Sequence, residues 1–71
     1  MPYIQVTLAS GPSLEAKQAL MAALARATHE ALDTPLDTVR VWITEIPAEE
    51  LSVGGVPFDE VRRQRAAQAG T

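Results

Sequence analysis

Two short segments with alternating side chains flank one long segment without glycine or proline, and this order constrains the fold more than any other feature of the chain. Apolar and more polar side chains alternate over residues 3–8 and again over residues 39–46, which is the period of a half-buried β-strand. Residues 14–32 are rich in Ala, Leu and Met, which favour a helix. Short loops between strand, helix and strand predict an α+β fold built on one right-handed βαβ unit with parallel strands.

The alternation also assigns the side chains of both strands to the two faces of the sheet. One helix covers only one of these faces, and parallel sheets are rarely left bare on the other. A further subunit is the simplest cover, so we expect the chain to oligomerise. One set comprises Ile4, Val6, Leu8, Val39, Val41 and Ile43, and the other comprises Tyr3, Gln5, Thr7, Arg40, Trp42 and Thr44, so the uncovered face carries Trp42 or its neighbours.

The helix is predicted to begin after Ser13, a favourable N-cap residue, and to end at Asp33-Thr34-Pro35. Its residues divide into an apolar face toward the sheet and a polar face toward solvent. His29 falls on the polar face, where we expect it to be solvated. The apolar face comprises Ala16, Leu20, Met21, Ala23, Leu24, Ala27 and Ala31, and the polar face comprises Glu15, Gln18, Arg26, His29 and Glu30.

The segments after the helix contain turn and hairpin patterns. Thr34 followed by Pro35 is typical of a short capped turn before the second strand. Residues 51–56 predict a short hairpin around the Gly54–Gly55 pair. An isolated hairpin is marginally stable, so we expect this hairpin to pack against a neighbouring subunit. Residues 57–71 are expected to continue as a polar tail.

Composition and charge exclude several classes of function. The chain has 71 residues, a net charge of −3 and no cysteine. A single small domain of this charge is a poor ligand for nucleic acid, because phosphate binding needs a basic surface. Arg62, Arg63 and Arg65 form a local basic cluster, which Asp59 and Glu60 partly neutralise, so we expect these arginines to be solvated.

The same composition bears on the cellular location. The absence of cysteine excludes disulfides and thiolate zinc sites and favours a reducing cytoplasm. No apolar run reaches the roughly 18 residues of a membrane span, and the N-terminus lacks a signal-peptide pattern. We therefore expect a soluble cytoplasmic protein without a membrane partner.

Few residues are equipped for catalysis. The chain has one histidine, no phosphate-binding glycine loop and no cluster with metal-ligand spacing, so no metal site is predicted. Glu49 and Glu50 are adjacent acids in a loop, where solvation is the ordinary interpretation. Pro2 follows the initiator Met1, and removal of Met1 would expose a secondary amine. An α-amino group titrates near 7.7–8.0, and an apolar pocket with a nearby cation lowers that pKa toward neutrality, which suits a general base.

Several motifs occur together in an informative order. Residues 32–41 read Leu-Asp-Thr-Pro-Leu-Asp-Thr-Val-Arg-Val, and the Gly54–Gly55 pair follows after the second strand. With Pro2 before the first strand and the predicted βαβ unit, these motifs resemble the 4-oxalocrotonate tautomerase family, the short-chain branch of the tautomerase superfamily. This resemblance implies hexamers built from dimers, with sites formed between subunits, and chemistry without a cofactor.

The resemblance covers residues 2–56. It implies one tautomerase-like domain over residues 2–71, in which residues 57–71 are a C-terminal extension. The small substrate that it implies is an enol bearing a carboxylate, which the enzyme converts to the keto isomer.

The resemblance assigns roles to three residues. Pro2 corresponds to the catalytic proline, and Arg40 corresponds to an arginine that binds the substrate carboxylate, although an ion pair between subunits is the alternative role for Arg40. Leu51 lies where the family often has a phenylalanine that makes the pocket apolar. Pro12 stands where many members have a second arginine, which predicts weaker binding of a dicarboxylate.

The leading hypothesis is a cofactor-independent tautomerase of a 2-hydroxy-dienoate or an arylenolpyruvate-type carboxylate. A second hypothesis is a hydratase or dehalogenase of unsaturated acids, in which Glu49 or Glu50 activates water. The third is a non-catalytic or co-catalytic subunit, which completes sites only beside a related chain in a hetero-oligomer.

Overall fold

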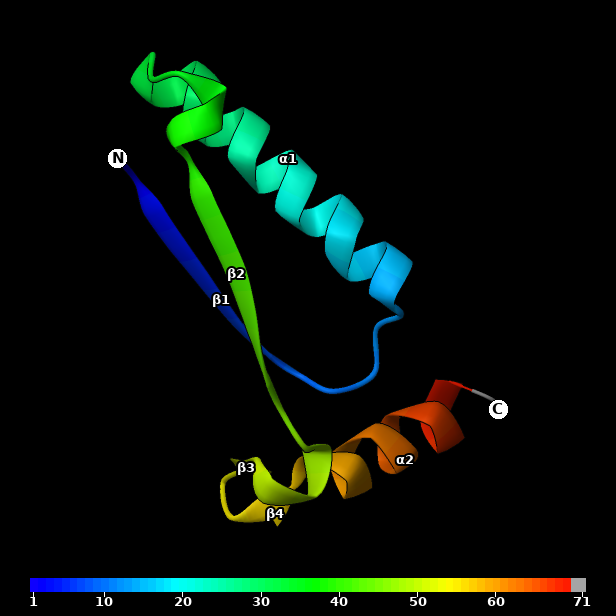
Figure 1. The fold of residues 1–71 in the computed structure, drawn as a ribbon. Helices are drawn as coiled ribbons and strands as arrows, with labels where there is room; N and C mark the ends of the chain where they lie inside the picture. Colours follow the sequence, from blue (N-terminus) through cyan, green and yellow to red (C-terminus); the bar gives the residue numbers. More distant parts are fainter. Residues whose placement is uncertain (70–71) are drawn as a thin grey trace.

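The computed structural model describes residues 1–69 and has the predicted strand, helix and strand order, followed by a hairpin and a second helix (Figure 1). Its architecture is therefore α+β, as the alternation and the helix-forming segment predicted. The elements are β1 (Tyr3–Ala9), α1 (Leu14–Leu32), the 3-10 turn η1 (Leu36–Thr38), β2 (Arg40–Ile46), the 3-10 turn η2 (Ala48–Glu50), β3 (Ser52–Val53), β4 (Val56–Pro57) and α2 (Phe58–Ala69).

Strands β1 and β2 form a parallel two-stranded sheet. The register runs from Tyr3 opposite Arg40 to Ala9 opposite Ile46, and two backbone hydrogen bonds extend it. The Arg40 N–H donates to the Pro2 carbonyl at 3.0 Å, and the Ser10 N–H donates to the Ile46 carbonyl at 2.9 Å. The start of each strand therefore lies at one end of the sheet, and the loops that follow both strands lie at the other end.

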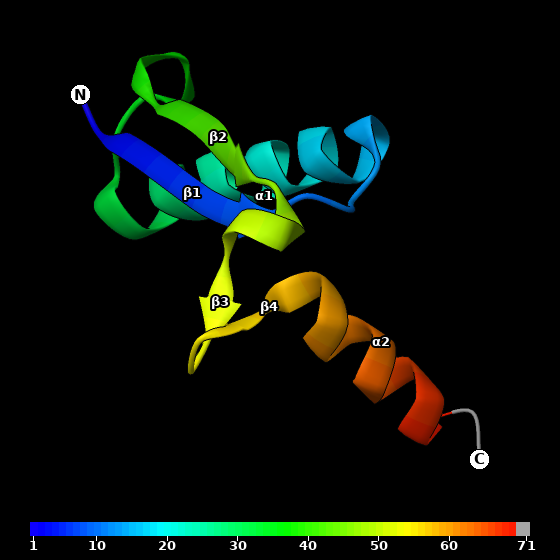
Figure 2. The ribbon, with the colours of Figure 1, turned by 90° about the horizontal axis from the view of Figure 1, so that it is seen from below.

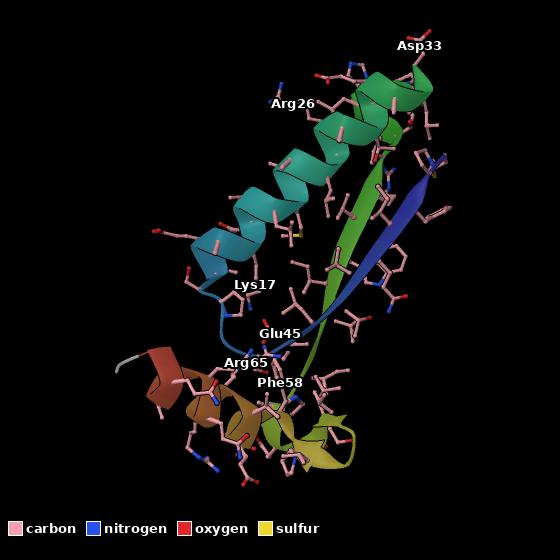
Figure 3. The ribbon with its side chains drawn as sticks, turned by 180° about the vertical axis from the view of Figure 1, so that it is seen from behind. Lys17, Arg26, Asp33, Glu45, Phe58 and Arg65 are labelled. Atoms are coloured by element: carbon pink, nitrogen blue, oxygen red, sulfur yellow. The ribbon has the colours of Figure 1, made fainter. Side chains whose placement is uncertain are left out.

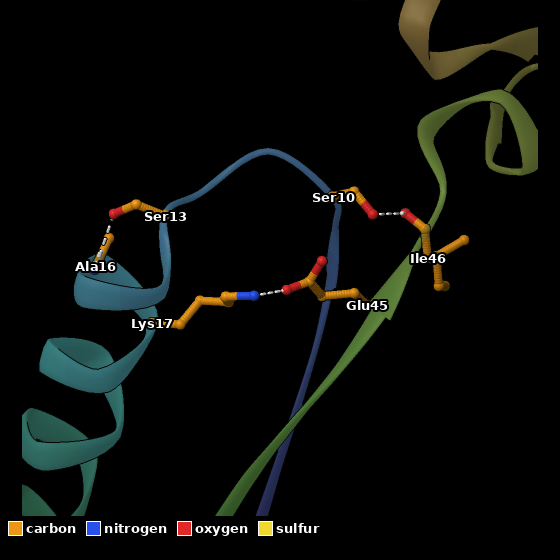
Figure 4. A network of polar contacts seen from close by, with 6 residues as sticks. All are labelled: Ser10, Ser13, Ala16, Lys17, Glu45 and Ile46. Carbon is orange, nitrogen blue, oxygen red and sulfur yellow. Dashed lines mark hydrogen bonds and ion pairs between the residues drawn. The ribbon is translucent and has the colours of Figure 1, made fainter.

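Helix α1 lies on one face of this sheet, and the other face is bare (Figure 2). The predicted alternation is confirmed, because inner residues of both strands are half-buried and outer ones are exposed. Ser13 caps the helix as predicted, since its hydroxyl oxygen accepts a 3.1 Å hydrogen bond from the Ala16 N–H (Figure 4). Asp33 ends the helix with a left-handed backbone, at a φ of 52°.

The face of α1 that packs on the sheet differs from the predicted one. The larger side chains set the orientation, because they bury more apolar area than alanine methyls do. The prediction that His29 is solvated is wrong. Its Nδ1 lies 2.5 Å from the Thr34 carbonyl oxygen, and the neighbouring Thr28 hydroxyl donates to the Leu24 carbonyl at 2.8 Å. The half-buried residues are Lys17, Leu20, Met21, Leu24, Ala25, Thr28 and His29, whereas Ala16, Ala23, Ala27 and Ala31 are exposed.

The turn before β2 and the hairpin after it follow the predicted positions, with one correction. Pro35, and not Thr34, precedes η1 as its N-cap, and the turn has no side-chain cap. Strands β3 and β4 pair antiparallel around Gly54 and Gly55, whose φ values are 61° and 89°. Positive φ at both central residues is the requirement of the tight hairpin turn that favours glycine, so the predicted hairpin is confirmed.

The polar tail expected after residue 57 is helical, because residues 58–69 form α2, which was not predicted. This segment consists largely of helix-forming residues, and an ion pair between Asp59 and Arg63, one turn apart at 3.6 Å, supports it. Its polar character hid this propensity from the pattern of apolar residues. Residues 70–71 of the predicted extension lie outside the described part of the chain.

No side chain among the described residues is fully buried, so one chain has no closed core of its own. The chain exposes 5109 Å², whereas about 4,300 Å² is usual for a compact protein of this mass. Its radius of gyration is 15.9 Å against about 11 Å for a compact domain of this length. Among the described residues, no helix has both the length and the apolar character required to cross a bilayer.

Candidate active site

Pro2 lies half-buried immediately before β1, at the end of the sheet where both strands begin. Its carbonyl accepts the hydrogen bond from the Arg40 backbone, which fixes the two residues side by side in the register. Met1 precedes Pro2 in the described chain, and the Tyr3 hydroxyl donates to the Met1 sulfur at 3.3 Å. The proline nitrogen is then an amide, and it becomes a basic amine only when Met1 is removed.

Arg40 begins β2 with its side chain exposed. One guanidinium N–H donates to the Asp37 carbonyl at 2.8 Å, so the turn η1 holds the head group near the start of the strand. No carboxylate among residues 1–69 pairs with it. A permanently charged, planar donor group with open N–H groups is suited to a substrate carboxylate.

Leu51 lies at the opposite end of the sheet, after β2 and η2. Strand β2 has seven residues, and at about 3.3 Å per residue its two ends are separated by roughly 20 Å. Leu51 is half-buried, and its carbonyl accepts a 2.7 Å hydrogen bond from the Phe58 N–H, which fixes the start of α2 beside it. One chain therefore places Pro2 and Arg40 together but does not bring Leu51 to them.

The loop between β1 and α1, residues 10–13, lies at the same end as Leu51 and carries Pro12. Helix α2 approaches this loop through Arg62, whose Nη1 donates to the Ser10 carbonyl at 2.6 Å. The Arg62 guanidinium also lies over the Phe58 ring, 4.6 Å from its centroid. The expectation that Arg62 is merely solvated is therefore wrong, and sequence reasoning missed this residue because it did not predict the helix that carries it.

An open cavity of about 230 Å³ lies between the start of α1 and β2. At its rim Lys17 of α1 and Glu45 of β2 point toward one another and form an ion pair (Figures 3 and 4). The hydrogen bond from Lys17 lowers the pKa of the Glu45 carboxyl below its ordinary value, and the Lys17 charge and the Ser10 hydroxyl add to this effect. None of the three sequence-predicted site residues lines this cavity. Its walls are formed by Leu14, Lys17, Met21, Val41, Trp42, Ile43 and Glu45.

The two remaining acidic candidates, Glu49 and Glu50, lie exposed on η2 beside Leu51. They are therefore at the end of the sheet away from the Pro2 of their own chain. Within residues 1–69, no group of histidine, cysteine or carboxylate side chains is arranged to hold a metal ion.

Comparison with known proteins places this arrangement in a family. The sequence pattern of the family described as "Tautomerase enzyme" matches residues 2–60. The "Probable tautomerase" of Ralstonia nicotianae is 49% identical over 57 residues, which are 80% of this chain and 81% of that protein. The 2-hydroxymuconate tautomerase of Pseudomonas sp. strain CF600 is 40% identical over 63 residues, which are 89% of this chain and 100% of that protein.

Solved structures give the same result. The heterohexamer 4-oxalocrotonate tautomerase of Chloroflexus aurantiacus superposes with a TM-score of 0.80 at 39% identity, over 87% of this chain and 100% of that chain. The family pattern covers most of the chain, and the sequence relatives are tautomerases, which are isomerases. The chain therefore belongs to the tautomerase enzyme family, as a 4-oxalocrotonate tautomerase-like isomerase.

Proposed function

We propose that this protein catalyses the enol-to-keto isomerisation of a small 2-hydroxy-dienoate or arylenolpyruvate-type carboxylate, with Pro2 as general base and acid and without a cofactor. The observation that carries this proposal is the position of Pro2. It directly precedes β1 as the second residue, where removal of Met1 leaves its nitrogen as the N-terminal amine, and the Arg40 backbone N–H donates to its carbonyl.

The chemistry needs one group that both accepts and returns a proton. The neutral amine of Pro2 takes the proton of the enol hydroxyl, and the C–O bond becomes a double bond. The electron pair of the adjacent C=C bond moves to the carbon atom that does not bear the oxygen. This carbon then takes the proton from the protonated amine. Atoms and charge balance, and the amine returns to its neutral form.

Arg40 is proposed to bind the substrate carboxylate and to draw electron density toward it. Its guanidinium is held by Asp37 and keeps open N–H groups, as the binding of an anion requires. Leu51 is proposed to exclude water from the pocket. Within one chain Leu51 lies at the end of the sheet opposite Pro2, so this role requires Leu51 from another copy.

We propose a homo-hexamer as the active assembly, and a single domain over residues 2–71 as its subunit. The bare face of the sheet, the lack of fully buried side chains among residues 1–68 and the separation of Leu51 from Pro2 support an assembly. A relative of the same fold is a heterohexamer. The absence of cysteine supports a cytoplasmic location.

Ketonisation followed by ultraviolet absorbance tests the proposal, with phenylenolpyruvate and 2-hydroxymuconate as substrates. Intact mass must first show that Met1 is absent. We expect Pro2→Ala to lose at least about 100-fold in kcat, because general acid–base catalysis contributes roughly 10²- to 10⁴-fold. The matched control is the wild-type chain with an N-terminal extension that is not removed, which keeps every side chain but acylates the Pro2 nitrogen. Full activity in either variant, with the assembly intact, would contradict the role of Pro2.

A co-catalytic subunit in a hetero-oligomer is the second candidate function, because a relative assembles in this way. Gel filtration of the chain alone separates the two candidates. A self-sufficient enzyme should form the symmetric hexamer, whereas a co-catalytic subunit should form a smaller assembly without activity.

A further inference from the structure

His29 is a half-buried group that the proposed mechanism does not use. Its Nδ1 lies 2.5 Å from the carbonyl oxygen of Thr34. A carbonyl oxygen only accepts hydrogen bonds, so Nδ1 carries a proton and is the donor. Between the two residues, Asp33 ends α1 with its left-handed backbone. His29 therefore ties the last turn of α1 to the segment that leaves the helix.

The segment that this hydrogen bond anchors is the turn η1. A 3-10 helix of three residues gains little stability from its own hydrogen bonds, whose geometry is poor, and no side chain caps its start. The Thr38 hydroxyl donates to the Pro35 carbonyl at 2.7 Å and lies 3.2 Å from the Thr34 hydroxyl. Thr34 is thus held by His29 through its carbonyl and by Thr38 through its hydroxyl, and these two contacts fix η1 to the end of α1.

The turn η1 in turn holds the side chain of Arg40. The Arg40 backbone is fixed by its hydrogen bond to the Pro2 carbonyl at 3.0 Å, but an arginine side chain has many rotamers. Its guanidinium donates to the Asp37 carbonyl of η1 at 2.8 Å. The end of α1, the turn and the start of β2 lie together at the end of the sheet where Pro2 lies (Figure 1). The direction of the guanidinium therefore depends on where η1 places the Asp37 carbonyl.

We propose that His29 is a positioning residue for Arg40. By anchoring η1 to α1 through Thr34, it sets the direction in which Arg40 presents its open N–H groups to the substrate carboxylate. His29 itself makes no contact with the substrate and transfers no proton in this role. A guanidinium that is already oriented loses less conformational entropy when it binds a carboxylate. The inference rests on the proposed function, because it assigns the support of the residue that binds the carboxylate there.

The test uses variants that separate the N–H group of His29 from its ring. His29→Phe keeps a planar ring and removes the N–H group, whereas His29→Asn loses the ring and keeps a side-chain N–H donor near the position of Nδ1. Thr28→Val is the matched control, because Thr28 is the half-buried neighbour and its hydroxyl donates within α1, to the Leu24 carbonyl at 2.8 Å. Each variant is made in the wild type and in Arg40→Ala, which gives a double-mutant cycle.

Three quantities are measured for each protein at intact assembly. The first is kcat/KM for phenylenolpyruvate, and the second is the urea midpoint of unfolding. The third is the ratio of the affinities for cinnamate and cinnamamide from calorimetric titration. Cinnamate is phenylenolpyruvate without the enol hydroxyl, and cinnamamide also lacks the charge, so their ratio reports the contact with the carboxylate independently of turnover.

An intramolecular hydrogen bond contributes enough to change an equilibrium by about 2- to 10-fold. We therefore expect His29→Phe to lower kcat/KM and the preference for cinnamate over cinnamamide by about this factor. His29→Asn should restore most of both, and Thr28→Val should change neither. In the Arg40→Ala background, His29→Phe should leave both quantities unchanged while the urea midpoint still falls, because the group through which it acts is gone.

Two results would show that His29 only supports the fold. One is the same loss of kcat/KM with and without the Arg40 side chain, and the other is an equal loss of affinity for cinnamate and cinnamamide. If His29→Phe does not assemble, Thr38→Val removes the other contact at Thr34, and Thr38→Ser restores its hydroxyl. Thr38→Val should then give the losses expected of His29→Phe, and unchanged values would overturn the inference.

Failure of the proposed function gives a different result. A wild type that isomerises neither phenylenolpyruvate nor 2-hydroxymuconate refutes the proposed function, and the cinnamate preference still decides whether His29 orients Arg40 toward an anion. A wild type that binds cinnamate no better than cinnamamide would refute both the role of Arg40 and this inference.

Discussion

Replacement of Trp42 by alanine tests whether the bare face of the sheet is an assembly surface. Trp42 is 43% exposed on the outer face of β2, and Tyr3 of β1 is 66% exposed beside it. The two rings form an edge-to-face pair with centroids 6.4 Å apart at 70°. An aromatic pair of this kind on an open sheet face is typical of a surface that another chain covers.

The magnitude follows from the area that the assembly would cover. A tryptophan side chain presents about 250 Å², so the 43% left exposed is about 100 Å². At about 25 cal/mol per Å², covering this area contributes about 2.5 kcal/mol per chain. Trp42→Ala should therefore weaken assembly by roughly 70-fold per chain. Loss of the Tyr3 contact costs the single chain a further 0.5–1.5 kcal/mol or so.

Sedimentation velocity over a dilution series measures this effect directly. We expect Trp42→Ala to dissociate at subunit concentrations at which the wild type is fully assembled. Leu32→Ala is the matched control, because Leu32 is also an exposed apolar residue, at 64%, but lies at the end of α1 away from the outer sheet face. Identical dissociation of Trp42→Ala and wild type would show that assembly does not bury the Trp42 ring, which would refute the assignment of this face as an assembly surface.

Three smaller changes test local features, each at fixed protein concentration. Ser13→Ala should lower the free energy of unfolding by about 1 kcal/mol, because it removes the cap of α1, and a urea midpoint equal to that of wild type would contradict this. Gly11→Ala should cost about 1–3 kcal/mol in the same assay, because φ is 152° and the new Cβ would press on Arg62; an unchanged midpoint would show that the loop adjusts freely. Since Lys17 lowers the folded pKa of Glu45, the carboxylate stabilises the fold above the unfolded pKa of about 4.3, and this contribution disappears as the pH falls below that value. Glu45→Gln should lack this part of the acid sensitivity, so thermal midpoints of the two proteins should converge between pH 7 and pH 3, and parallel curves would argue against the ion pair.

The alternation of side chains predicted β1 and β2 within one residue of their observed bounds. It could do so because successive side chains of any strand point to opposite faces of the sheet. The face of α1 was harder to predict. Alanines and larger apolar residues occupy overlapping positions around the helix, and only the packing against the sheet showed that Leu20, Met21 and Leu24 determine the contact.

The candidate site was predictable to the extent that it depends on positions along the chain. Pro2, Arg40 and Leu51 were assigned through the resemblance of the chain's motifs to the tautomerase family, and their roles remain predictions. Arg62 could not be found in this way, because its contact with Ser10 joins residues 52 positions apart.

The sequence by itself determined the local elements: two alternating strands, a helix that begins after its cap Ser13, and a hairpin at Gly54–Gly55. These depend on side-chain period, capping and backbone conformation, which neighbouring residues specify. Only the tertiary structure decided that Leu51 lies a strand length away from Pro2 and that α2 returns to the loop after β1. Such contacts depend on how separate elements pack, and no local pattern of residues encodes them.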